Sequence, residues 1–215
     1  MANISAWLDG VSIRVPGASK IEIDSAVRTI TREFCSKTLL YVKQLTAINI
    51  VAGTASYTLT APTDCSIITV ERVEVNGLFV SPTSMDLLDR SPDSWRQVES
   101  SQPIEYMVDA EKVLMFKEIP DTSYAGGLIV WVAVKPSPTT STLPDFLFDD
   151  WYETILNGAV AYLLRMPNKS WTSIEGSEYF YDFYDGYLSE AKNKKYTGKA
   201  KVSIRVQSEP FAVIG

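Results

Sequence analysis

Residues 143–171 read LPDFLFDDWYETILNGAVAYLLRMPNKSW, and their apolar side chains return at the spacing of one helix face. Pro144 and Asp145 form a helix-start signal, because proline fixes φ at the entrance and the aspartate side chain can cap free N–H groups. Pro167 stops this helix, and Ser170 can cap a second helix that carries an aromatic run. The stretch therefore predicts an antiparallel pair of helices with a short joint.

Each of the two predicted helices has one apolar face. On the first helix this face comprises Phe148, Trp151, Ile155, Ala159, Tyr162, Leu163 and Met166. On the second it comprises Trp171, Ile174, Phe180, Phe183, Tyr184, Tyr187 and Ala191. Because amphipathic helices bury their apolar faces against a neighbour, we expect four large side chains to lie buried between the pair: Trp151, Ile155, Phe180 and Phe183.

The N-terminal part predicts one long helix, and the middle of the chain predicts strands. A helix from about residue 21 places Ile23, Val27, Ile30 and Phe34 on one face, which can pack on the C-terminal pair. From residue 48 the sequence becomes β-rich, and Asn76-Gly77 is a strong hairpin signal because both residues tolerate positive φ. A second hairpin is expected to join residues 104–108 and 113–116, and LIVWVAV at 128–134 is typical of a buried strand.

These elements predict an α+β fold. It consists of an α-helical bundle built from the N- and C-terminal segments, an inserted antiparallel β-domain and an extended C-terminal arm. The corresponding division has four segments: residues 1–47 as the N-terminal helical part of the bundle, 48–143 as the β-rich insert, 144–198 as the C-terminal helix pair, and 199–215 as the extended basic arm.

The composition argues against an enzyme. None of the 215 residues is histidine, which removes histidine-based catalysis and histidine metal ligands together. Cys35 and Cys65 are too few for a disulfide framework, and Cys35 falls on the apolar face of the first long helix. We therefore expect no catalytic, cofactor-binding or metal-binding residues. No signal peptide or membrane-length apolar run is visible, so we expect assembly in the cytoplasm and no membrane contact.

The charge of the chain is uneven. Residues 193–215 carry five basic residues and one acidic residue, although the formal net charge of the chain is −6. An acidic body argues against a DNA-binding surface there. The candidate contact residues of the arm, toward another subunit or a portal protein, are Lys199, Lys201, Val202, Ile204, Arg205 and Val206. They alternate like a strand that can add to another subunit's sheet; an edge strand on its own β-domain and a frayed tail are the alternatives.

The order of these features resembles a known family. An aromatic helix and a basic tail follow four short motifs. These are L-P-D, an acidic residue before Trp-Tyr, I-L-N-G-A and L-L-R-M-P-N-K-S-W. This pattern is similar to the head-to-tail adaptor (connector) proteins of tailed bacteriophages, in particular the tubular adaptor family of short-tailed phages. Near the N-terminus, Trp7, Leu8, Pro16-Gly17-Ala18 and AVRTITREFC at 26–35 resemble the opening helix of that family.

The resemblance implies a virion structural protein at the head–tail junction, without enzymatic activity. Such a protein would form a ring, expected to hold twelve copies, between the portal protein and the tail nozzle or tube. The ring would continue the DNA channel, and genome DNA would pass through its lumen without specific binding. The resemblance also implies assembly in the host cytoplasm.

Two other readings of the sequence remain open. Glu178, Asp182 and Asp185 lie among tyrosines, and glycosidases pair carboxylates beside aromatic side chains that stack on sugars. A carbohydrate-binding or glycan-cleaving module is therefore one alternative, although the aromatic residues also follow helical spacing. A different tail-completion ring protein is the other.

Overall fold

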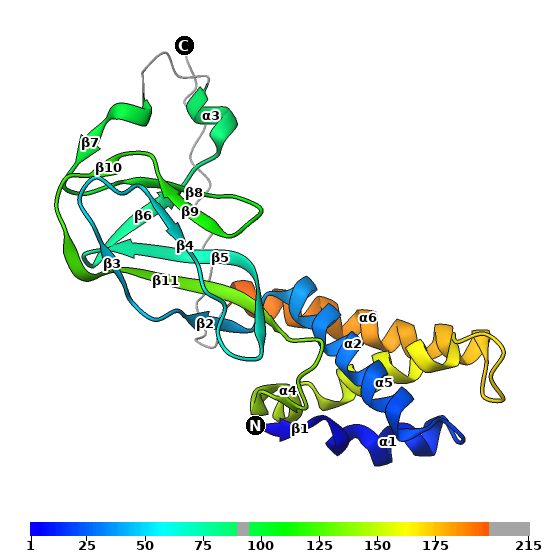
Figure 1. The fold of residues 1–215 in the computed structure, drawn as a ribbon. Helices are drawn as coiled ribbons and strands as arrows, with labels where there is room; N and C mark the ends of the chain where they lie inside the picture. The colour runs from blue at the N-terminus through cyan, green and yellow to red at the C-terminus, as the bar shows by residue number, and fades with distance from the viewer. Residues whose placement is uncertain (90–94, 198–215) are drawn as a thin grey trace, which may run out of the picture.

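The computed structural model describes residues 1–89 and 95–197, and it places helices at one end and a curled sheet at the other (Figure 1). Two distant stretches of the chain build the helical end. The first contains β1 (Ala2–Asn3), the 3-10 helix η1 (Ile4–Trp7), α1 (Leu8–Arg14) and α2 (Lys20–Thr38). The second contains β12 (Thr142–Leu143), α4 (Asp145–Asp149), α5 (Tyr152–Leu164) and α6 (Ile174–Thr197). β1 pairs antiparallel with β12, which joins the two stretches.

Local sequence signals account for the limits of α2. The Ser19 side chain accepts a hydrogen bond from the Glu22 N–H, and the Glu22 side chain accepts one from the Ser19 N–H, which makes a capping box. The helix ends at Leu39, whose φ of 53° is left-handed. The expected apolar face is buried, with Ile23, Val27, Ile30 and Phe34 no more than 5% exposed. The predicted long helix is therefore confirmed.

The C-terminal helices differ from the prediction in two places. The first predicted helix is broken at Asp150 and Trp151, so the apolar residues do not all share one face. Trp151 and Ile155 are buried as expected, but Phe180 is only half-buried and Phe183 is 46% exposed. The second helix begins at Ile174 rather than after Ser170, and Ser173 caps it by accepting a hydrogen bond from the Gly176 N–H at 3.1 Å.

The middle of the chain forms an eight-stranded sheet. Its strands are β2 (Val42–Gln44), β3 (Ile48–Ile50), β4 (Ser56–Thr58), β5 (Cys65–Val75), β6 (Leu78–Pro82), β8 (Glu105–Val108), β9 (Val113–Phe116) and β11 (Tyr124–Pro136). The order across the sheet is β2-β11-β5-β6-β8-β9-β4, and β3 also pairs with β11. The described residues also contain α3 (Met85–Asp89), the 3-10 helix η2 (Trp95–Gln97), and β7 (Glu99–Ser100) paired with β10 (Ile119–Pro120).

Both predicted hairpins are present. β5 and β6 pair antiparallel across Asn76 and Gly77, whose φ values are 49° and 81°. β8 and β9 also pair antiparallel, and the predicted buried strand at 128–134 lies within the long β11.

The predicted fold class is wrong. The chain is not a helical bundle with an antiparallel insert, because a curled mixed sheet forms its main body and the helices lie at the ends of the chain. The sheet is mixed because β6 and β8 run parallel, with Ser81 opposite Glu105 and Pro82 opposite Tyr106. Parallel neighbours need a long crossover connection, and the chain from 83 to 104, with α3 and η2, supplies it. The four-segment division remains a prediction.

Two hydrophobic clusters meet at the boundary between helices and sheet. One is formed by the helical end and includes Trp7, Phe34 and Tyr184, each fully buried. The other lies inside the curled sheet and includes Leu114 and Leu128. Tyr41 packs against both clusters. Helices and sheet are therefore joined by side-chain packing as well as by the chain itself.

Candidate interaction surfaces

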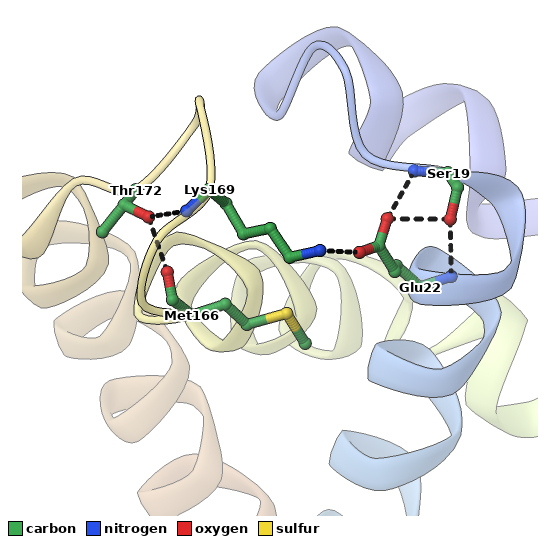
Figure 2. A network of polar contacts seen from close by, with 5 residues as sticks. All are labelled: Ser19, Glu22, Met166, Lys169 and Thr172. Carbon is green, nitrogen blue, oxygen red and sulfur yellow. Dashed lines mark hydrogen bonds and ion pairs between the residues drawn. The ribbon is translucent and has the colours of Figure 1, made fainter.

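A polar network ties the start of α2 to the loop between α5 and α6 (Figure 2). Lys169 Nζ donates to Glu22 Oε1 at 2.8 Å, and Glu22 Oε2 accepts from Ser19 N at 2.9 Å and Ser19 Oγ at 2.7 Å. Thr172 Oγ1 donates to Met166 O at 2.6 Å, which closes the loop that presents Lys169. The hydrogen bond from Lys169 and those from Ser19 lower the pKa of Glu22 to about 2.

A glycine sets the distance between three helices. A Cβ on Gly158 of α5 would lie 2.6 Å from Ile30 Cγ2 of α2 and 2.9 Å from Tyr184 Cδ2 of α6. Ser177 Oγ of α6 also donates to Ala161 O of α5 at 2.9 Å. α6 is therefore held close against α5 and α2 along one face.

One flank of α6 carries exposed aromatic side chains. Tyr179, Phe183 and Tyr187 recur every four residues and are 60%, 46% and 39% exposed. The rings of Tyr179 and Phe183 lie 5.0 Å apart in an edge-to-face arrangement. A contiguous exposed row of large aromatic residues is typical of a protein–protein contact. We call this row the aromatic flank.

The geometry of α6 does not favour the glycan alternative. Glu178, Asp182 and Asp185 follow their own helical spacing on the exposed side of α6, away from the line of the aromatic flank. A glycosidase needs two carboxyl groups that face each other across a sugar. Side chains on the convex surface of a single helix diverge instead, so no such pair is formed by these three residues.

The end of α6 is fixed beside the sheet. Lys195 Nζ donates to Leu39 O at 2.7 Å and pairs with Glu71 Oε1 at 2.8 Å. Lys194 Nζ lies 5.0 Å from the centre of the Trp151 ring. A cavity of about 430 Å³ lies here, lined by Leu40, Tyr41, Val42, Phe146, Asp150, Trp151, Lys194 and Lys195. The last turns of α6 therefore lie beside the chain that leads into β2.

The predicted contact residues of the arm lie outside the described residues: Lys199, Lys201, Val202, Ile204, Arg205 and Val206. Their role therefore remains a prediction. Sequence reasoning had not found the cavity at the end of α6 or the aromatic flank. The sequence analysis places Phe183 and Tyr187 on an apolar face, but in the structure both lie on the exposed aromatic flank together with Tyr179.

The two thiols lie in different surroundings. Cys35 is buried in the helical cluster, and burial raises the pKa of its thiol to about 12. Cys65 lies near Tyr41, whose pKa burial also raises. Within residues 1–89 and 95–197, no group of three or more histidine, cysteine, aspartate or glutamate residues is placed to hold a metal ion. No helix in this described part is long and apolar enough to cross a membrane.

The exposed aromatic flank is thus a candidate surface for contact with other proteins. The sequence matches the family described as SU10 adaptor protein over residues 1–207, and the chain belongs to this family. The resemblance to phage head-to-tail adaptors is thereby confirmed. The family is structural rather than enzymatic, and membership implies a virion component that interacts with other phage head and tail proteins. No curated protein matches the chain.

Proposed function

We propose that the protein is the adaptor at the head–tail junction of the virion, where copies form a ring between the portal protein and the tail nozzle or tube. The expected ring has twelve copies. Its lumen continues the DNA channel without binding the genome specifically, and assembly takes place in the host cytoplasm. The observation that carries this proposal is the family match over residues 1–207, which includes residues 199–207 of the basic arm.

The surfaces of the subunit support the same function. A ring needs each copy to present two different surfaces that fit each other, because its contacts are head-to-tail around the circle. The aromatic flank of α6 offers one exposed surface of large side chains. The basic segment 193–215 and the acidic remainder of the chain supply opposite charges that favour association of copies.

The test is to purify the full chain with the portal protein of the same phage and to measure the masses of the complexes. We expect a closed ring bound to the portal, with a mass that corresponds to twelve copies. Imaging of the virion should then place the ring between head and tail. If the chain remains a monomer with the portal present, or is found elsewhere in the particle, the proposal fails.

A further inference from the structure

The two edges of the eight-stranded sheet lie on either side of a groove. β2 and β4 are the terminal strands in the order of the sheet. A cavity of about 530 Å³ is lined by residues 44–48, from the last residue of β2 to the first of β3, and by Thr58 and residues 60–63, from the last residue of β4 onward. We call this groove the seam. Its two sides come from one continuous stretch of chain, because the turn after β3 leads directly into β4 (Figure 1).

The backbone of β2 is paired on one side. Leu45 N donates to Val130 O at 2.8 Å, Val134 N donates to Tyr41 O at 2.8 Å, and Lys43 lies opposite Val132. The backbone groups of successive residues point to opposite sides of a strand. Tyr41, Lys43 and Leu45 face β11, so the backbone groups of Val42 and Gln44 face away from it. Among the described residues, no strand pairs with this outer side of β2.

The same alternation holds for β4. Leu59 N donates to Lys112 O at 3.0 Å, and Phe116 N donates to Ala55 O at 2.9 Å. The backbone groups of Ser56 and Thr58 therefore face away from β9. In the part of the chain that the structure describes, nothing pairs with this outer side of β4 either. Gln44 and Thr58 line the seam, so each of its two sides carries outward-facing backbone groups of one edge strand.

The side chains at the seam do not block pairing. Natural sheets protect an edge with charged residues, proline or bulges. Here the exposed lining residues are all uncharged: Gln44, Thr46, Ala47, Thr58, Thr60, Ala61 and Thr63. Pro62 lies beyond the end of β4. An extended backbone can therefore pair with the seam without burying a charge.

The arm has the chemistry that this seam requires. Val202, Ile204 and Val206 alternate with Ser203 and Arg205, which is the pattern of a strand with one apolar side. The arm is basic, whereas residues 48–143 carry twelve acidic and six basic residues, so the sheet attracts it. Four residues separate the end of α6 from Val202 and let the strand extend away from its own helix.

We propose that the seam of each copy receives residues 202–206 of a second copy as an added strand. The inference rests on the proposed ring function, since only an assembly of copies gives this contact a role. The inserted strand pairs with β2 on one side and with β4 on the other. Because β2 and β4 run antiparallel to each other, the inserted strand is parallel to one of them and antiparallel to the other.

The test uses two full-length preparations that both carry a photoreactive amino acid at position 203, one of them labelled with ¹⁵N. The preparations are mixed, assembled, illuminated and digested, and the cross-linked peptides are identified by mass spectrometry. We expect cross-links to residues 44–48 and 58–63 that contain one labelled and one unlabelled peptide. Cross-links only within one copy, or only to other parts of the fold, overturn the proposal.

Two substitutions at one position sharpen the test. Thr58→Pro removes an N–H that faces the seam but keeps the bonds of Ala55 and Leu59 to the neighbouring strand. Thr58→Val keeps the N–H and serves as the control. We expect Thr58→Pro to lower the yield of mixed cross-links about tenfold and Thr58→Val to leave it unchanged. If Thr58→Pro lowers the melting temperature, Thr60→Lys replaces it as the blocking variant, because it brings a positive charge to a basic strand.

The outcome also separates this inference from the proposed function. Rings that form on the portal without mixed cross-links at the seam leave the adaptor function standing and overturn the strand insertion. Equal yields from Thr58→Pro, Thr60→Lys and the unmodified protein likewise overturn it. If neither rings nor mixed cross-links form, both the function and the insertion fail.

Discussion

The helical end and the sheet differ in which backbone groups they leave unpaired. At the start of α2, the capping box of Ser19 and Glu22 satisfies free N–H groups, and Lys169 ties the neighbouring loop to the same carboxylate. The sheet ends in β2 and β4, whose outer sides have no partner among the described residues. The start of α2 is thus capped by its own side chains, whereas the outer sides of β2 and β4 leave backbone groups with which another strand can pair.

The largest effect should come from the packed core of the helical end. Phe34 is fully buried and its ring lies 5.4 Å from that of Trp151, so Phe34→Ala should lower the free energy of unfolding by about 3–5 kcal/mol. Phe183→Ala, on the aromatic flank, should change it by less than about 1 kcal/mol. Denaturant unfolding of both variants measures this. Equal losses would show that the flank is part of a core.

A second comparison uses two helical glycines. Gly158→Ala should destabilise the fold by about 1–3 kcal/mol, because its Cβ would meet Ile30 and Tyr184. Gly186→Ala in α6 meets nothing within 4 Å, and the better helix propensity of alanine should stabilise the fold by about 0.5–1 kcal/mol. Thermal unfolding should therefore move in opposite directions. Two shifts of the same sign would mean that Gly158 does not set the helix spacing.

The third prediction concerns the boundary between helices and sheet. Lys195→Met removes the hydrogen bond to Leu39 O and the ion pair with Glu71, and it should cost about 1 kcal/mol. Lys192→Met, also in α6 but exposed, is the matched control and should be nearly neutral. Melting curves of both variants at low and at high salt measure the loss of stability. A loss that is the same for both variants would contradict the anchoring role of Lys195.

The smallest effect should be the pH dependence of the Glu22 contact. The pKa of Glu22 is lowered to about 2, so its contribution to stability is complete above the ordinary pKa of a glutamate and is lost as the pH falls through about 2. Titration of the Glu22 carboxyl by NMR should show this low pKa, and Lys169→Met should raise it toward the ordinary value. A pKa that is the same in both proteins would show that Lys169 does not contribute.

Features set by neighbouring residues could be predicted from the sequence. The hairpin at Asn76-Gly77 depends on two residues that accept positive φ, and it lies where predicted. α2 likewise follows from its apolar spacing and from local signals at its two ends. The helix break at Trp151 was missed because the apolar spacing continues across it.

Features set by distant contacts could not be predicted. The parallel pairing of Ser81 with Glu105 depends on how the connection after β6 crosses the sheet, and no short stretch records that path. The exposure of Phe183 depends on which side of α6 faces α5 and α2, and two flanks of this helix are aromatic.

Tyr41 gives the subunit a mechanical property. Its ring lies 5.7 Å from that of Phe146 in the helical end, while its carbonyl accepts a hydrogen bond from Val134 N in the sheet at 2.8 Å. Arg28 and Arg32 of α2 reinforce this boundary by donating to Thr140 O and Pro136 O on the chain that leaves β11. A force applied to the helices is therefore carried into the sheet by several parallel contacts.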